Sequence, residues 1–571
     1  MQAARPVTPG ASSQTSDAAP ALARVPAARF DSVTMESASA SAPTARERWA
    51  LHILQAGAIA VVLAALPYKA FDLDRFFVPK ELVLLVAASL ASLLCLAGRR
   101  AIRLTVVDIL LGDFLIVSLV SAILATNHWA AERAFAISLA GAGLFWAASA
   151  LRRVGLVRPL LVALAFGVVL GAATSLAQAY GVESVYFSIN RAPGGTFGNR
   201  NFVAHLVAIG LPALVLVALT ARRGLGSIFG GCGMAIVTAA LVLSRSRGAW
   251  LAVLVLAIPV GLLGYVTRDR WREARTVRRL IVLAAAAVVG VIAAIVLPNH
   301  LDWNSESPYL DSAAGLVNYK AGSGRGRLLQ YANSLEMTRA HIVFGVGPGN
   351  WPVAYPKYAS RSDPSMSQDD RVTSNPWPSS DWMAFLSERG VVGFAFLLLT
   401  MLGLLGRAVR DLRGRTGRDP ERVLTAIALI GTLVALAVVG AFDAVLLIAV
   451  PTFYVWTLAG ILSPPGPGGI RVHAGIEELG PAIVTGLAIV VIGRSVGQLS
   501  AMAVYDSSTR TASLSRAAML DPGNYRIRTR LAQAYLARGD CTHARAEARA
   551  ARGLLPNAGE PKRQLAECGS R

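Results

Sequence analysis

Residues 267–297 read TRDRWREARTVRRLIVLAAAAVVGVIAAIVL, a basic segment followed directly by an apolar one. The apolar part, residues 280–297, is close to the length of roughly 20 residues that an α-helix needs to cross a membrane. The basic part, residues 267–279, contains six arginines, and short loops of this kind mark the cytoplasmic side of membrane proteins. This stretch therefore predicts a membrane-spanning helix that starts on the cytoplasmic side.

Similar apolar segments recur along the chain. Hydrophobic residues make up 54% of the 571 residues and charged residues only 16%, and the mean hydropathy is +0.51. This composition excludes an ordinary soluble globular enzyme. It predicts twelve or thirteen membrane-spanning helices, of which the last is the least certain. Their predicted ranges are 51–67, 81–98, 104–126, 134–150, 156–180, 201–220, 227–243, 248–266, 280–297, 384–405, 423–442, 445–462 and 481–503.

The basic residues distinguish the two sides of the membrane. The formal net charge is +21, which in a soluble protein would favour a nucleic-acid partner. However, 20 of the 55 Lys and Arg residues lie in five short loops that follow alternate predicted spans. By the positive-inside rule these loops are cytoplasmic, so the N-terminus is inside and the long loop after the ninth span is outside. The charge therefore records topology, and we exclude nucleic acid as a partner.

The predicted fold is all-α: a polytopic membrane helix bundle with one large outer loop and a short C-terminal helical repeat region. Residues 1–48 are rich in Ala, Ser, Thr and Pro and lack the apolar core of a signal peptide, so we expect a disordered cytoplasmic tail. The other predicted boundaries are 49–297 for the first nine spans, 298–383 for the outer loop, 384–504 for spans ten to thirteen and 505–571 for the helical region. If the thirteenth span is real, the C-terminus is outside as well.

The C-terminal region contains an internal repeat. Leu520 and Pro522 recur 34 residues later as Leu554 and Pro556. This period resembles that of the tetratricopeptide repeat, of which the region holds at most two copies. Because such repeats are stable only when several stack, we expect the region to pack on the membrane domain or on a protein partner. An unrelated helical hairpin is the alternative interpretation.

The four cysteines show no metal-ligand spacing and are too few for a disulfide scaffold. Cys95 and Cys232 lie near the cytoplasmic ends of predicted spans and are most simply core residues. Cys541 and Cys568 both lie in the C-terminal region, and they can pair if that region is in an oxidising compartment. We expect neither a metal nor a cofactor.

Residues 243–250, LSRSRGAW, join two apolar helices on the outer side with almost no loop between them. Arg245 and Arg247 in this segment break the positive-inside pattern. A guanidinium is always charged and binds phosphate bidentately, so arginines at the outer boundary suit a lipid-linked phosphate. The alternative is that they extend to lipid headgroups.

Two further outer segments carry polar motifs. Residues 191–201, RAPGGTFGNRN, offer the donors Arg191, Arg200 and Asn201, and their glycines allow close approach of the backbone. The long outer loop contains GRGR at 324–327, FGVGPGNW at 344–351 and SSDWMAFLSERG at 379–390. Aromatic residues beside Arg, Asp and Asn are typical of a sugar site, whereas a belt of interfacial aromatics is the alternative.

These motifs together resemble the O-antigen ligase/polymerase family of bacterial membrane proteins. GGTFGNRNFVAHL resembles that family's GTFxNxNxxA segment, SRSRGAW its SRGAW motif, and GRLLQYANSLEMTRAHIVFGVGPGNW its loop signature. SSDWMAFLSERGVVGF resembles the motif HNxxLxxxxExGxxG that closes the family's loop. The similarities run from about residue 190 to residue 395 in the expected order, and the N-terminal tail and the repeat region lie outside them.

The resemblance implies a glycosyltransferase of the bacterial inner membrane that takes a glycan from undecaprenyl diphosphate at the periplasmic face. The acceptor is another lipid-linked glycan in a polymerase, the lipid A core in a ligase, or a protein in an O-oligosaccharyltransferase. The product is then a surface polysaccharide such as O-antigen or exopolysaccharide, or a glycosylated protein. Membrane lipids and a protein bound by the C-terminal repeats are further expected partners.

The resemblance also assigns roles to individual residues. Arg247 corresponds to the arginine of SRGAW and is the first candidate for holding the diphosphate, and Arg327 of the loop is the second. The candidate substrate-binding residues are Arg191, Arg200, Asn201, Arg245, Asn350 and Trp351.

One departure from the family concerns the catalytic base. Counting back from Glu388, the His-Asn pair of the ligase motif falls on Ser379 and Ser380, so the expected histidine is absent. An unactivated serine is a poor base at neutral pH. Asp381, Glu388 or His341 can replace it, or the protein belongs to a polymerase-like branch that does not use this histidine, or it is inactive. We favour the polymerase-like branch over the ligase.

Two functions of other classes stay open at the level of sequence. A transporter, such as one for bicarbonate, requires ionisable residues along a path through the bundle, and Asp113 and Asp443 are the obvious candidates. A non-catalytic scaffold would recruit other proteins through the repeat region. The concentration of polar motifs on the outer face favours the transferase over the transporter.

Overall fold

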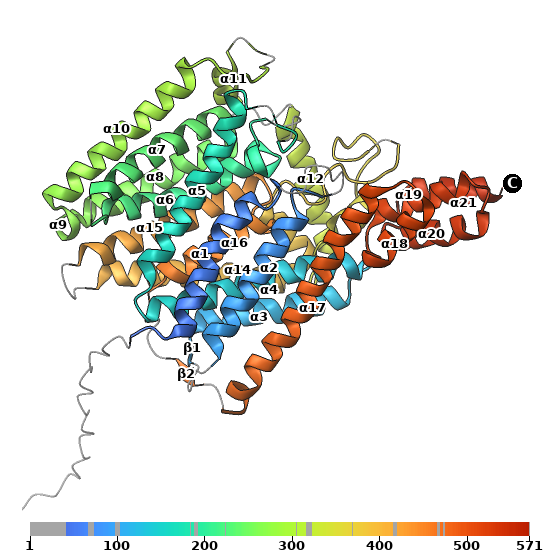
Figure 1. Ribbon diagram of the computed structural model, residues 1–571, viewed down its shortest axis with the longest axis horizontal. Helices are drawn as coiled ribbons and strands as arrows, with labels where there is room; N and C mark the ends of the chain where they lie inside the picture. The colour runs from blue at the N-terminus through green and yellow to red at the C-terminus, as the bar shows by residue number, and fades with distance from the viewer. Residues whose placement is uncertain are drawn as a thin grey trace, which may run out of the picture. The chain divides into compact units, whose positions relative to one another are not determined.

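The computed structural model describes residues 42–66, 74–97, 103–182, 184–187, 192–222, 224–303, 305, 307–315, 322–367, 369–414, 419–464, 469–471 and 474–569. Nearly all of the predicted disordered tail, residues 1–48, lies outside these ranges. The described chain is a bundle of α-helices, shown in Figure 1, which confirms the predicted all-α membrane fold.

The predicted spans correspond to long helices on either side of the outer loop. The helices of the first part are α1 (Ala45–Leu63), α2 (Val78–Leu96), α3 (Val106–Ile123), α4 (His128–Arg153), α5 (Val157–Ala179), η2 (Gly195–Phe197), α6 (Arg200–Leu219), α7 (Gly224–Ser244), α8 (Arg247–Val266), α9 (Arg268–Trp271) and α10 (Ala274–Val296). The loop contains α11 (Pro308–Ala314), α12 (Gly322–Ala340), α13 (Trp351–Ala354) and η3 (Tyr355–Lys357). The second part contains α14 (Asp381–Arg413), α15 (Pro420–Phe442), α16 (Ala449–Leu462) and α17 (Ala474–Ser507).

Within the described residues, 11 helices are long and apolar enough to cross a membrane. Two predicted spans fall short of this measure. The first coincides with α1, whose first turn holds three charged residues, Arg46, Glu47 and Arg48. The other coincides with α16, which has only 14 residues because the chain before Ala449 is not helical. A helix of this length belongs inside the bundle, and every residue of α16 is buried.

The arginine-rich connections meet at one end of the bundle. Arg152 Nη1 donates to the carbonyl oxygen of Ile461 (2.7 Å), and Arg275 Nη2 donates to that of Arg222 (2.8 Å). The two-residue strands β1 (Arg103–Leu104) and β2 (Ile470–Arg471) pair antiparallel at the same end, where Figure 1 shows them below the bundle. These contacts bring basic loops together, and the side of the membrane on which they lie stays a prediction.

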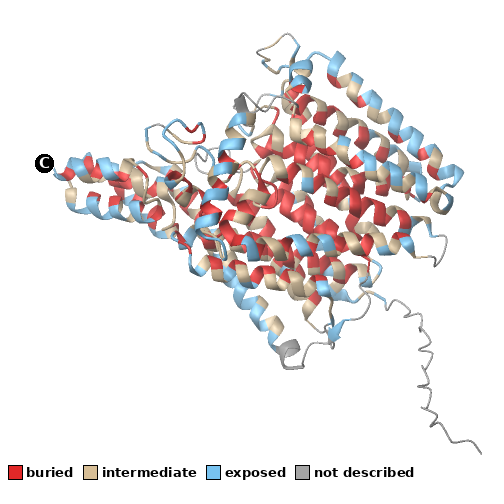
Figure 2. Ribbon diagram, turned by 180° about the vertical axis from the view of Figure 1, so that it is seen from behind, coloured by how far each residue is buried: buried red, intermediate tan, exposed pale blue. Residues whose placement is uncertain are grey.

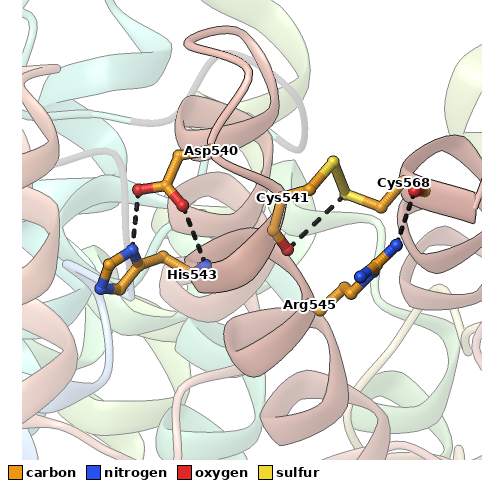
Figure 3. The surroundings of a disulfide bond; sticks show 5 residues. All are labelled: Asp540, Cys541, His543, Arg545 and Cys568. Atoms are coloured by element: carbon orange, nitrogen blue, oxygen red, sulfur yellow. Dashed lines mark hydrogen bonds and ion pairs between the residues drawn. A yellow bond between two sulfur atoms is a disulfide. The ribbon is translucent and has the colours of Figure 1, made fainter. Parts of the chain in front are cut away.

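The C-terminal region forms four helices, α18 (Thr511–Leu520), α19 (Tyr525–Leu536), α20 (Cys541–Leu554) and α21 (Glu560–Gly569), at the end of the bundle opposite the basic loops. They contact the outer loop, since Asn557 Nδ2 donates to the carbonyl oxygen of Val353 (3.4 Å). A disulfide joins Cys541 of α20 to Cys568 of α21 (Figure 3). Whether this region is a tetratricopeptide repeat stays a prediction.

Burial divides the spans into inner and outer helices. Helices α6 and α15 are buried along most of their length, whereas only a small share of α8, α10 and α17 is buried. Figure 2 shows the exposed faces of α10 and α17 at opposite margins of the bundle. Because these exposed faces are apolar, they are the surfaces that contact lipid in a membrane. Apolar side chains thus serve two purposes: they pack against other helices inside the bundle, and they face lipid at its margins.

Candidate active site

A large basic cavity lies at the end of the bundle opposite the arginine-rich loops. Its volume is about 1500 Å³, which exceeds the roughly 300–1,000 Å³ of small-molecule sites. Its walls come from the start of α6, the α7–α8 connection, the chain after α10, α12 and the end of α15. The described residues that line it include two carboxylates and five arginines, Arg75, Arg200, Arg245, Arg247 and Arg327. This arginine cavity suits a large anionic ligand.

Two predicted site residues, Arg245 and Arg247, lie at the tight turn between α7 and α8. Arg245 has a φ of 50°, a left-handed conformation that non-glycine residues rarely adopt. Its Nε donates to Ser312 Oγ (2.7 Å) and its guanidinium lies 4.6 Å from the ring centroid of Trp303. Burial lowers the pKa of Arg245. Arg247 Nη1 donates to the carbonyl oxygen of Gly315 (2.7 Å), so both guanidiniums are held at the cavity wall.

Arg327 reaches the same cavity from α12. It is half-buried, and its Nε is buried without a hydrogen-bond partner among the described residues. The positive charges of Arg327 and Arg245 both act on Arg247 and repel its guanidinium. An anionic group bound among them removes this repulsion. A diphosphate fits best, because its oxygens accept bidentate hydrogen bonds from guanidinium groups.

The start of α6 adds polar groups to the cavity. Asn199 caps the helix, its side chain accepting a hydrogen bond from the backbone N–H of Asn201 (3.0 Å). Asn201 Nδ2 in turn donates to Asp443 Oδ2 (3.2 Å), and Arg200 lines the cavity beside them. One turn further, His205 is only 2% exposed, and its Nδ1 has no partner among the described residues. His205 also lines the cavity.

The segment that precedes α6 is fixed by a buried cation. Lys80 Nζ donates to the carbonyl oxygen of Thr196 (2.8 Å) and lies 4.3 Å from the ring centroid of Phe197. Lys80 therefore holds the GTF part of the motif, residues 195–197, in place by contacts that do not involve the arginines of the cavity. Arg191, the remaining predicted residue of this segment, lies outside the described residues.

A second cavity, of about 630 Å³, adjoins the first. Its described lining includes five aromatic residues, Phe76, Phe77, Phe197, Phe202 and Trp377. We call it the aromatic cavity. Four residues line both cavities: Asn199, Asn201, Arg327 and Asp443. These residues mark the boundary at which a group bound in one cavity can meet a group bound in the other.

Asp381, one of the predicted catalytic residues, lies behind Asp443 and lines neither cavity. Its carboxylate is fully buried, and it accepts hydrogen bonds from the backbone N–H groups of Val445 (2.8 Å) and Leu446 (2.7 Å). Its own N–H donates to the carbonyl oxygen of Asp443 (3.2 Å). These bonds hold the connection between α15 and α16 out of the helical conformation. Asp381 therefore positions Asp443 at the cavity boundary.

Ser379, which stands where the family has histidine, lines the aromatic cavity together with Asp443. The Ser379 N–H donates to Gln330 Oε1 (2.9 Å). The Tyr331 hydroxyl donates to the carbonyl oxygens of Ser379 (3.2 Å) and Ala441 (2.5 Å), and burial raises the pKa of Tyr331. Tyr331 thus ties the histidine position to the segment that carries Asp443. A carboxylate is therefore available close to where the histidine is missing.

Glu388, Asn350 and Trp351 are buried and line neither cavity. Glu388 Oε1 accepts a hydrogen bond from the N–H of Trp351 (3.2 Å), and its Oε2 forms an ion pair with Arg389 (3.1 Å). Asn350 exchanges hydrogen bonds with the backbone of Asn127 (2.8 and 3.0 Å). Their contacts join the outer loop to α14 and to the α3–α4 connection, and a catalytic or binding role for them stays a prediction.

Several residues that line the cavities were not among the predicted site residues, and His205, Asp443 and Trp377 are the ones that bear on the chemistry. His205 follows Asn201 by four positions, so the two share a helix face, and this spacing was the available signal. Asp443 stood out in the sequence only as a candidate for transport. His341, the third candidate base, is exposed at the end of α12 and lines neither cavity. Among the described residues, no group of His, Cys, Asp and Glu could hold a metal ion.

The apolar helices and the basic cavity define a multi-pass membrane protein that can bind an anionic ligand. Residues 232–398 match the family model described as O-antigen ligase, so the chain carries an O-antigen ligase domain, which supports the predicted family. The match includes Arg245, Arg247 and Arg327. The chain matches no curated protein. The domain supports a glycan-related membrane function of the O-antigen ligase type.

Proposed function

We propose that this protein transfers a glycan from undecaprenyl diphosphate to an acceptor at the periplasmic face of the bacterial inner membrane. The observation that carries the proposal is the arginine cavity, where Arg245, Arg247 and Arg327 converge from different elements. Its volume of about 1500 Å³ accommodates a diphosphate together with attached sugars. The matched O-antigen ligase domain supports the same reaction class.

The proposed reaction is a glycosyl transfer in which the oxygen of an acceptor hydroxyl bonds to the anomeric carbon as the bond from that carbon to the diphosphate breaks. The diphosphate leaves with the electron pair, and Arg247 and Arg327 stabilise its negative charge. Asp443 takes the proton of the attacking hydroxyl. The position of Asp443 on the wall of both cavities supports this role, because the base must reach a hydroxyl beside the bound diphosphate.

Among the possible acceptors we favour a second lipid-linked glycan, as in a polymerase, over the lipid A core or a protein. The histidine of the ligase motif is replaced by Ser379, which supports this choice. Asp443, which lines the aromatic cavity together with Ser379, offers another base. Transport is less well supported. Asp113 lines neither cavity, and Asp443 lies beside Arg327 and Asn201, which suit the binding of a diphosphate and a sugar. A non-catalytic scaffold does not explain why Arg245, Arg247 and Arg327 converge on one cavity.

The proposal is tested with Arg247→Ala and Arg327→Ala. Each should lower the rate of transfer by about 10²–10³-fold, the usual effect of removing one group that stabilises a developing negative charge. The measurement uses the purified protein in lipid nanodiscs with undecaprenyl-diphosphate-linked repeat units, followed by separation of the glycan products. The glycan profile of a deletion strain carrying each variant gives the corresponding result in cells.

Arg325→Ala is the matched control. Arg325 lies two positions before Arg327 on α12, but it is exposed and lines neither cavity, so its loss should leave transfer unchanged. Thermal unfolding of all three variants shows whether the bundle is intact. Wild-type transfer by folded Arg247→Ala and Arg327→Ala variants would exclude the proposed role of the arginine cavity.

A further inference from the structure

We propose that the aromatic cavity is the acceptor subsite and that it binds an uncharged sugar at the end of the acceptor glycan. The inference rests on the proposed function, because it assigns the second half of the same transfer reaction. It adds what the arginines alone do not specify, namely where the attacking hydroxyl is held and what kind of group carries it.

The first observation is the arrangement of the aromatic rings. The ring centroids of Trp377 and Phe77 are 5.3 Å apart, and those of Trp377 and Phe202 are 6.5 Å apart. Trp377 is half-buried, so its ring is supported on one side while part of it stays accessible. A pyranose ring has apolar C–H faces and a polar edge of hydroxyl groups. It therefore matches a cavity in which flat apolar rings alternate with amide and hydroxyl groups.

The second observation is the charge of the lining. Among the described residues that line the aromatic cavity, only Arg327 and Asp443 are charged, and both lie on the boundary with the arginine cavity. A phosphorylated acceptor end would have no cation of its own deeper in this cavity. An uncharged sugar needs only hydrogen bonds. The volume of about 630 Å³ is that of a site for a small ligand, such as the end of a glycan.

The polar groups of the wall are already fixed by one another. Gln330 is 5% exposed, and its Nε2 donates to Ser365 Oγ (2.8 Å) while its Oε1 accepts from Ser379. Ser374 Oγ donates to the carbonyl oxygen of Ser365 (3.0 Å). Asn375, next in the chain, is exposed on the same wall. A wall built in this way presents its donors and acceptors without reorganisation when a sugar binds.

The third observation is the position of Asp443. It is a member of both linings, and Asn201, which donates to its carboxylate, is another. A sugar stacked on Trp377 would therefore place a hydroxyl toward the carboxylate from one cavity, while the donor diphosphate lies on Arg247 in the other. The boundary thus brings together the three groups that the transfer requires.

The test measures initial rates of the full-length protein in nanodiscs with undecaprenyl-diphosphate-linked repeat units as donor. The acceptor probe is the same oligosaccharide released from its lipid by mild acid. Trp377→Ala should raise the KM for the acceptor by about tenfold or more, with a much smaller change in the KM for the donor. Trp377→Phe, which keeps a ring, should have a smaller effect on the KM for the acceptor.

Trp303→Ala is the matched control for the other cavity. Trp303 lines the arginine cavity and contacts Arg245, so its loss should raise the KM for the donor more than that for the acceptor. Trp49→Ala is the control for the loss of a tryptophan. Trp49 is 64% exposed in α1 and lines neither cavity, so this variant should change neither KM. Asn375→Ala removes an exposed amide from the wall, so it tests the site even if Trp377→Ala fails to fold.

The outcomes separate this inference from the proposed function. If the wild-type protein shows no transfer with any acceptor, the proposed function fails. If the wild-type protein transfers but neither Trp377→Ala nor Asn375→Ala raises the KM for the acceptor, only the acceptor subsite is overturned. Efficient transfer to a serine- or threonine-containing peptide, with none to the free oligosaccharide, also overturns the subsite in favour of a protein acceptor.

Discussion

At the scale of single residues, burial and access to the cavities distinguish three carboxylates that are similar candidates in the sequence. Asp381 and Glu388 are buried, and both accept hydrogen bonds from the backbone. Asp443 also accepts a backbone hydrogen bond, from the N–H of Ala444 (2.9 Å), but it is half-buried and lines both cavities, where the Asn201 side chain donates to it. A base must be reachable from the substrate, so only Asp443 meets this geometric condition.

Asp443→Asn should lower the rate of transfer by about 10²–10⁴-fold, the usual contribution of general-base catalysis. Asparagine keeps the shape of the side chain and can still accept the hydrogen bond from Asn201, so donor binding should change little. The measurements are the transfer rate and the binding of the lipid-linked donor. Glu388→Gln provides the contrast, because it should mainly lower the thermal stability; a loss of activity confined to Glu388→Gln would reverse the assignment.

At the scale of elements, the outer loop is docked on a break in α14. Gly390 has a φ of 67° inside this helix, so the helical hydrogen bonding is interrupted there. The carbonyl oxygens of Ser387 and Glu388 accept hydrogen bonds from the N–H groups of Val346 (3.0 Å) and Gly347 (2.9 Å). The glycine-rich part of the loop signature therefore supplies donors to buried helix carbonyl groups at the break. It is a docking segment, and it lies away from both cavities.

Gly345→Ala should destabilise this docking strongly. Gly345 has a φ of 68°, and a Cβ there would lie 2.3 Å from the carbonyl carbon of Glu388. We expect a loss of about 3 kcal/mol or more, measured as a lower midpoint of thermal unfolding in detergent. Gly155→Ala is the control, because Gly155 has a φ of 78° but nothing within 4 Å of its Cβ position. Equal destabilisation of both variants would show that the loop is not held at α14.

At the scale of the whole molecule, the C-terminal helices hold the loop that walls the aromatic cavity. Asp370 accepts a hydrogen bond from the Tyr525 hydroxyl (2.8 Å) and its carbonyl oxygen accepts one from the N–H of Gly559 (2.7 Å). Burial raises the pKa of Tyr525, so its hydroxyl stays a donor. The segment that carries Asp370 continues into Ser374 and Trp377 of the cavity wall. The C-terminal helices can therefore affect the shape of the aromatic cavity, although they lie outside the membrane-spanning helices.

Asp370→Ala should therefore raise the KM for the acceptor by about threefold to tenfold, while the bundle stays folded. Asp369→Ala is the matched control, since only the carbonyl oxygen of Asp369 contacts the C-terminal region, through Arg563 (2.7 Å). The measurement is the transfer assay with the released oligosaccharide as acceptor. Complete loss of transfer by a folded Asp370→Ala variant would instead favour a scaffold function for the C-terminal region.

The disulfide bears on the sidedness of the whole molecule. Cys541 and Cys568 are joined in the C-terminal region, which lies at the end of the bundle opposite the basic loops. Disulfides persist in oxidising compartments such as the bacterial periplasm. This supports the proposed topology, with the outer loop and the C-terminus in the periplasm and the arginine-rich loops in the cytoplasm.

The sequence by itself determined the membrane class and the apolar helices, and it carried the resemblance to the O-antigen ligase family. Apolar length and the placement of arginines are local properties, because each span meets lipid or other spans through its own side chains. The same locality identified Arg245, Arg247 and Arg327 as exceptions to the charge pattern. It could not show that α16 is short, because the segment before it is held by Asp381, which lies 64 residues from Val445 in the chain.

Only the tertiary structure decided which of the polar motifs share a site. Arg247, Arg327 and Asp443 come from α8, α12 and the end of α15, and no spacing along the chain relates them. It also separated Glu388 and Asn350, which serve docking, from Asp443, which faces the cavities. The physical reason is that a residue's role depends on its burial and on its partners across the fold, and helix packing sets both.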